Sequence, residues 1–130
     1  MDALPEWPEG TVAVLTTRPG HAIPVSLVHR AGDRRLVVGL APRRRSLANL
    51  RNDPRCAVTL LGPGVAFTAY GTATVSEADP VAVVRIDVAE IADHDHATFE
   101  ITAGVDWRWT DDHAAQRDAE AREAMRRLAP

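Results

Sequence analysis

The sequence contains no lysine and a single cysteine among its 130 residues. All fifteen basic residues are arginines, which excludes Schiff-base chemistry and a lysine general base. One thiol, Cys56, can form neither an internal disulfide nor a multi-cysteine zinc site, and we expect it to be buried and unreactive. This use of cysteine fits a reducing compartment, so we expect a cytoplasmic protein.

Long hydrophobic runs are also missing. No apolar stretch approaches the roughly 20 residues that cross a bilayer, and residues 1–8 lack the basic-then-apolar order of an export signal. The composition, 45% hydrophobic and 25% charged, is that of a soluble globular protein. A chain of this length suits one domain spanning residues 1–130, and we expect it to have no membrane partner.

Charge is divided unevenly along the chain. Residues 1–70 contain nine arginines and five acidic residues, whereas residues 71–130 contain six arginines and thirteen acidic residues. The first part is therefore the better suited to bind an anion. A pI near 5.9 argues against a general nucleic-acid-binding protein, for which a broadly basic domain is typical.

The hydrophobic periodicity predicts a mainly β (α+β) domain with two helices. Pro24 favours an edge position for the second strand, and Asp53-Pro54 ends the first helix. There is no βαβ alternation, no glycine-rich dinucleotide motif and no Walker phosphate loop, which excludes a doubly wound fold. Strands are predicted at 11–17, 22–30, 35–40, 56–61, 65–75, 83–91, 98–102 and 105–109, a short helix at 46–52, and a C-terminal helix from about 112 that carries Ala121 and Met125 on one face.

Three consecutive arginines stand where the third strand gives way to the short helix. Arg43, Arg44 and Arg45 are followed by Ser46, the first residue of that helix. Helix N-terminal amides and guanidinium groups both bind phosphate, so this junction is a candidate anion site. The alternative is a basic turn that faces water.

Two other clusters have competing interpretations. Asp93, His94, Asp95 and His96 suggest a metal site, but alternate residues of a strand point to opposite faces, so only the two histidines could converge; a solvated acidic turn is favoured. The alternation of residues 105, 107 and 109 places two tryptophans on one face of a predicted strand. They are either core or dimer-interface residues, or a platform that stacks on a ligand.

The run Asn49-Leu-Arg-Asn-Asp-Pro-Arg55, together with His21-Ala-Ile-Pro-Val-Ser26 and Leu36-Val-Val-Gly39 before it, resembles the pyridoxamine 5'-phosphate oxidase-like flavin-binding proteins. The resemblance covers residues 10–75 well and residues 83–109 in outline. It implies a split β-barrel and a homodimer that holds FMN, or the deazaflavin coenzyme F-420, in a groove between the subunits. Some branches of the family bind haem instead.

The resemblance also implies a set of cofactor-binding residues. The family's Ser-Arg-Lys phosphate-binding run falls on Arg44, Arg45 and Ser46, so Arg45 is the retained arginine, while Arg44 replaces a small hydroxyl residue and Ser46 replaces the lysine. Val25 and Ser26 match the strand that lies along the isoalloxazine ring.

Further matches lie at the end of the third strand and near the C-terminus. Gly39 and Leu40 correspond to the strand end beside the phosphate. Trp107, with Arg108 or Trp109, corresponds to an aromatic residue and an arginine that reach the cofactor from the second subunit.

The function implied by the resemblance is that of an FMN- or F-420-dependent oxidoreductase acting on a small-molecule substrate. Because the cofactor carries the electrons, no side chain has to act as the chemical catalyst, and we assign no catalytic residue. The alternative is a non-catalytic flavin- or haem-binding module of the same fold.

Overall fold

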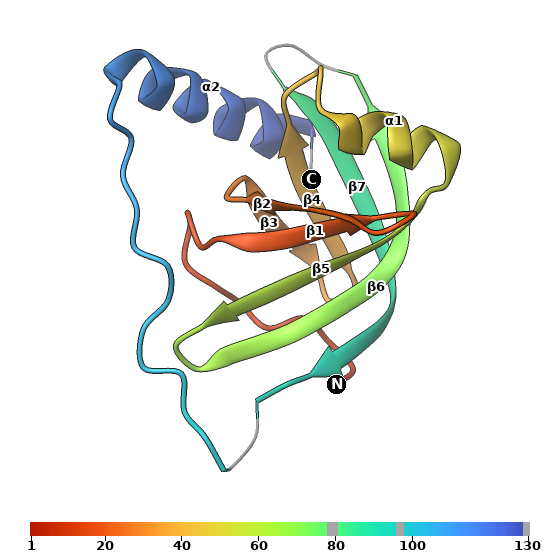
Figure 1. The fold of residues 1–130 in the computed structure, drawn as a ribbon, viewed down its shortest axis with the longest axis vertical. Helices are drawn as coiled ribbons and strands as arrows, with labels where there is room; N and C mark the ends of the chain where they lie inside the picture. The colour runs from red at the N-terminus through yellow and green to blue at the C-terminus, as the bar shows by residue number, and fades with distance from the viewer. Residues whose placement is uncertain (78–80, 96–97, 129–130) are drawn as a thin grey trace.

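The computed structural model describes residues 1–77, 81–95 and 98–128, which form a curled sheet and two helices (Figure 1). No helix in this part of the chain has the length and apolar composition of a membrane-spanning segment. The strands are β1 (Ala13–Thr17), β2 (His21–Val25), β3 (Val28–Gly32), β4 (Arg35–Leu40), β5 (Arg55–Gly62), β6 (Val65–Ser76) and β7 (Ala82–Asp93), and the helices are α1 (Arg45–Asn52) and α2 (Asp112–Leu128).

The strands form one antiparallel sheet in the order β2-β1-β5-β6-β7-β4-β3. Its two edges, β2 and β3, are separated in the chain by Ser26 and Leu27 alone. A connection of two residues bridges at most about 10 Å, whereas the edges of a flat seven-stranded sheet would lie about 29 Å apart. The sheet must therefore curl until its edges approach each other. This is the mainly β split barrel that the sequence predicts.

The single strand predicted at 22–30 is wrong in one respect, because the chain forms two strands there. At Leu27 it leaves one edge of the sheet for the other, and the Leu27 carbonyl accepts a hydrogen bond from the backbone N–H of Gly39 at 2.9 Å. Pro24 does lie on an edge strand, where a missing N–H costs least. Leu27 and Val28 are both apolar and no glycine lies between residues 21 and 31, so the sequence does not mark the break as a turn.

The strands predicted at 98–102 and 105–109 are also wrong. Residues 98–111 form no strand; they run along the side of the barrel from the end of β7 to the start of α2 (Figure 1). A strand needs a neighbour to accept its hydrogen bonds, and residues 98–111 pair with neither edge strand of the sheet, β2 or β3. Alternation of apolar residues was therefore a misleading signal in this segment.

The main core fills the inside of the barrel. It is built from alternate residues of the strands, with Leu15, Leu36 and Phe67 fully buried at its centre. The ring of Trp7 packs against Phe67 with the ring centroids 5.6 Å apart. Leu47 on α1 belongs to the same cluster, so burial of the helix's apolar side fixes α1 to the barrel.

A second, smaller cluster lies on the outer side of β4 and β7. Ala121 and Met125 of α2 pack there against Val37, Val81 and Val83. These two helix residues are the pair that the sequence places on one face. Both sides of β4 are therefore buried, one by the barrel core and the other by α2.

Candidate functional site

The N-terminal end of α1 is open and electropositive. Arg44 is the N-cap residue, with extended backbone dihedral angles and no side-chain capping hydrogen bond, and the first turn contains no acidic residue. The first amides of a helix have no partner inside it, so they can bind an anion. The side chains of Arg43, Arg44 and Arg45 are exposed and pair with no residue in the described part of the chain. The free donors at this junction fit a phosphate.

Ser46 lies differently from the arginines beside it. Its side chain is fully buried, and its hydroxyl has no hydrogen-bond partner among the described residues. The structure thus brings Arg44 and Arg45 to one surface while the Ser46 side chain faces inward. At this surface Ser46 can contribute its backbone amide in the first turn of α1.

The residues matched to the ring and to the strand end beside the phosphate lie where the barrel edges meet. The side chains of Val25 and Leu40 are buried in the barrel core, so only their backbone could contact a ligand. Ser26 is partly buried, and its carbonyl accepts a hydrogen bond from Arg122 Nη2 of α2 at 3.4 Å. This backbone is therefore already in contact with α2.

Gly39 is the most tightly covered of the matched residues. A Cβ atom at this position would lie 2.6 Å from Met125 Sδ, 3.1 Å from Val81 Cγ2 and 3.3 Å from Leu27 Cβ. Glycine inside a strand often marks a close approach of another group, and here that group is α2. The arginine junction of the expected site is thus open, whereas α2 covers Gly39 beside it. The sequence did not predict that Met125 and Arg122 lie next to the site. Gly39, a glycine inside a strand, was the one signal of a close approach there.

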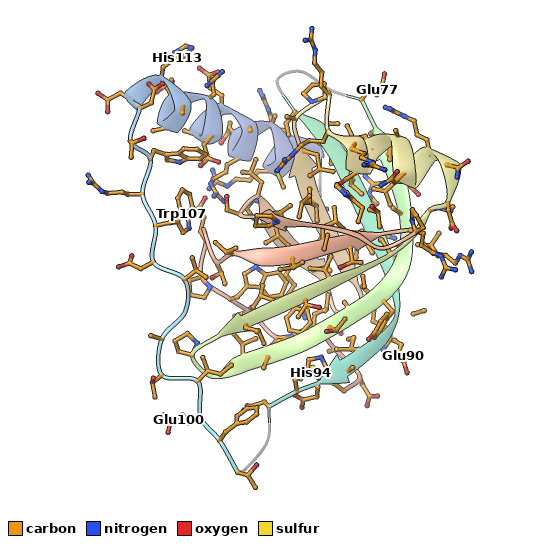
Figure 2. All side chains as sticks on the ribbon, viewed as in Figure 1. Glu77, Glu90, His94, Glu100, Trp107 and His113 are labelled. Carbon is orange, nitrogen blue, oxygen red and sulfur yellow. The ribbon has the colours of Figure 1, made fainter. Side chains whose placement is uncertain are left out.

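Trp107 and Trp109 lie on the connection between β7 and α2. Their rings meet edge to face with centroids 5.2 Å apart, and Trp107 Nε1 donates a hydrogen bond to the Gly10 carbonyl at 2.9 Å. Both side chains remain more than a third exposed. In Figure 2, Trp107 lies on the opposite side of the view from α1, so within one chain the tryptophans do not meet the arginine cluster.

A cleft of about 510 Å³ opens on the outer side of β1, β5, β6 and β7. The cleft is lined by Tyr70, which is 44% exposed, and by the charged residues Arg18, Arg55 and Glu90. Asp53 next to the cleft pairs with Arg55 at 2.7 Å and with Arg18 at 3.5 Å. The hydrogen bonds from Arg55 lower the pKa of Asp53 to about 2, so this carboxylate stays ionised near neutral pH.

Cys56 at the same cleft should react slowly with thiol reagents. Burial raises the pKa of its thiol to about 11, so at pH 8 only about one molecule in a thousand carries the reactive thiolate. We expect Ellman's reagent to modify the folded protein at least about tenfold more slowly than the protein unfolded in guanidinium, which serves as the control. Equal rates in the two states would show that the thiol is accessible and ionisable in the fold.

His94 has a hydrogen-bond partner on β6. Its Nε2 shares a hydrogen bond of 2.8 Å with the Thr68 hydroxyl, which in turn meets the Thr59 hydroxyl at 2.9 Å. This chain ties the end of β7 to β6 and β5. His96, the other half of the considered pair, lies outside the described residues, and no group of three potential ligands occurs within them.

Comparison with known proteins identifies the fold. No protein-family model and no curated protein matches the sequence. Among solved structures, HupZ from Group A Streptococcus is similar, with a TM-score of 0.57 and 14% identity over 74% of this chain and 90% of that one. A pyridoxamine 5'-phosphate oxidase-like protein from Lactobacillus delbrueckii has a TM-score of 0.57 and 16% identity over 70% of this chain and 94% of that one.

An FMN-binding protein from Syntrophomonas wolfei is similar too, with a TM-score of 0.51 and 10% identity over 68% of this chain and 78% of that one. At identities this low, the likeness establishes the fold alone. The chain has the split β-barrel fold of the pyridoxamine 5'-phosphate oxidase-like and FMN-binding proteins.

Proposed function

We propose that this protein binds FMN, or the deazaflavin coenzyme F-420, and acts as an oxidoreductase on a small molecule in the cytoplasm. The observation that carries the proposal is the open N-terminus of α1, where Arg44 and Arg45 have no partner in the described part of the chain. An FMN-binding protein has the same fold. When bound, such a cofactor supplies hydride or electron transfer, and the protein supplies binding and orientation.

Each part of the site has a distinct role in this proposal. Arg44 and Arg45 bind the cofactor phosphate through charge-assisted hydrogen bonds, and the first-turn amide of Ser46 adds a donor. The backbone of Val25–Ser26 borders the ring, and that of Gly39–Leu40 lies beside the phosphate. Because the Cys56 thiol is protonated and buried, it is unsuited to act as a nucleophile in this site.

The proposal includes a homodimer. Trp107, Trp109, Tyr70, Leu61 and Val14 are each more than a third exposed, which is a large apolar area for a small domain. The tryptophans stand away from α1 in their own chain, so they could approach its cofactor site only from a partner subunit (Figure 2). A second copy would cover this surface and complete both sites.

The second candidate is a flavin- or haem-binding module without turnover. It is favoured by one observation, the buried serine at position 46 where the resembled family has a lysine. The positive charge that the lysine would carry is supplied instead by the Arg44 guanidinium, two residues earlier in the run. A binding module needs only affinity, whereas an enzyme must also place a substrate over the ring.

Titration of the purified protein with FMN and, separately, with coenzyme F-420 tests the proposal. We expect saturable quenching of cofactor fluorescence by one of them at one molecule per chain. Turnover of the reduced cofactor with electron acceptors distinguishes the enzyme from the module. The variants His29→Ala and Cys56→Ala should retain that turnover, since the cofactor carries the electrons. Absence of binding by both cofactors would overturn the proposal.

A further inference from the structure

Helix α2 rests on two backbone segments that are expected to border the cofactor. Met125 packs on Gly39 so closely that even a methyl group would collide with its sulfur at 2.6 Å. Arg122 donates a hydrogen bond to the Ser26 carbonyl. The segment matched to the ring and the strand end matched to the phosphate side are thus both in contact with one helix.

The attachment of α2 to the barrel is limited. Ala121 and Met125 of α2 belong to a cluster of five buried residues that is separate from the main core, and Ala124 and Arg122 are buried as well. The contact also buries two nitrogen atoms, His29 Nε2 and Arg122 Nη1, for which no described residue provides a hydrogen-bond partner. A buried polar atom without a partner destabilises the contact that buries it. The interface is therefore less favourable than its apolar part alone suggests.

Ion pairs with the N-terminal segment supply the remaining attachment. Glu9 accepts a hydrogen bond from Arg126 at 2.9 Å and lies 3.6 Å from Arg122. Arg122 also pairs with Asp118 of the same helix at 3.0 Å. Arg126 and Glu9 are half exposed, and pairs of this kind contribute little to stability in water.

The connection that precedes α2 would let the helix move without disturbing the sheet. Residues 98–111 belong to no strand, and they lead to α2 along the side of the barrel (Figure 1). Undocking α2 would break the small cluster and the Glu9 pairs, but no strand pairing depends on the helix.

We propose that α2 is a displaceable cover: in the free protein it covers Ser26, matched to the ring, and Gly39, matched to the strand end beside the phosphate, and it leaves when the cofactor binds. This inference rests on the proposed function. The arginines before α1 stay exposed in the docked state, so the cofactor phosphate can contact them before α2 leaves. Because binding then requires the undocked state, the measured affinity equals the intrinsic affinity reduced by the fraction of molecules in which α2 is undocked.

Variants that weaken docking test the cover. Met125→Ala removes the side chain that covers Gly39, and Glu9→Gln weakens the ion pairs at a position outside the proposed site. Glu123→Gln is the matched control, because Glu123 pairs only with Arg126 of its own helix among the described residues, at 3.4 Å. FMN and coenzyme F-420 are each titrated into the wild-type protein and the three variants. Hydrogen exchange of residues 112–128 is followed with and without cofactor.

We expect Met125→Ala to bind the cofactor at least about tenfold tighter than the wild type, Glu9→Gln to bind more tightly by a smaller factor, and Glu123→Gln to be unchanged. Amides of α2 should exchange faster when cofactor is present, while those of β5 and β6 should not. Binding to the wild type with equal or weaker affinity in Met125→Ala, or unchanged exchange in α2, would overturn the cover and leave the proposed function standing. Binding to none of the proteins would overturn both.

Discussion

Replacing Gly71 with alanine should destabilise the fold by about 3 kcal/mol and lower the thermal midpoint by about 10 °C. Gly71 lies at an irregularity in the pairing of β6 with β7, and an added Cβ would stand 2.3 Å from the Asp87 carbonyl oxygen and 2.9 Å from Ile86 Cγ2. The oxygen belongs to the backbone of the neighbouring strand, which cannot rotate away as a side chain can. The two strands would have to separate locally.

Gly62→Ala is the matched control for this effect. Gly62 ends β5, and an added Cβ there would meet its nearest neighbour, Val65 Cγ1, at an ordinary contact distance of 3.4 Å. We expect a change of less than about 1 kcal/mol in the free energy of unfolding, measured by denaturant titration. Equal stability of the two variants would show that β6 and β7 do not approach each other as closely at Gly71.

Arg45→Ala should weaken cofactor binding by about one to two orders of magnitude, because it removes one charge-assisted contact worth roughly 1.5 to 3 kcal/mol. The thermal midpoint of the cofactor-free protein should stay nearly unchanged. Arg45 is exposed and pairs with no described residue, so its side chain does not stabilise the fold. Fluorescence titration measures the affinity, and differential scanning fluorimetry measures the midpoint.

Arg51→Ala provides the control at the opposite end of the same helix. Arg51 pairs with Glu77 rather than facing the open N-terminus. Its removal takes the same charge from α1 but should leave the affinity within about twofold of the wild type, since screened charges at that distance interact weakly. An equal loss in both variants would indicate a general charge effect and contradict a phosphate site at Arg45.

The sequence predicted most of the barrel because its signals are local. β4 follows from an apolar run between turn residues, and α1 follows from the change of period and from the Asp53-Pro54 stop. The split of the second hairpin strand at Leu27 could not be found this way. It depends on a hydrogen bond to Gly39, which is distant in the sequence, and on the curvature of the whole sheet.

The arginine junction of the candidate site was predictable from the sequence, and the packing around it was not. Three arginines before a helix indicate an anion site whatever the tertiary structure, and the structure leaves them open to solvent. The inward direction of the Ser46 side chain and the position of Met125 over Gly39 depend on how two helices pack on the barrel. At Trp107 the sequence predicted a strand that the structure does not contain. The residue lies in the connection between β7 and α2 and donates a hydrogen bond to the Gly10 carbonyl.

Comparing the affinities for FMN and riboflavin tests the central claim, that the N-terminus of α1 holds the phosphate of a flavin. The two ligands share the ring and differ in the phosphate, so their affinity ratio measures what the arginine junction contributes. We predict that FMN binds at least about tenfold tighter than riboflavin and that the ratio falls in Arg45→Ala. Equal affinities in the wild type, or a ratio that survives the Arg45 substitution, would contradict the account.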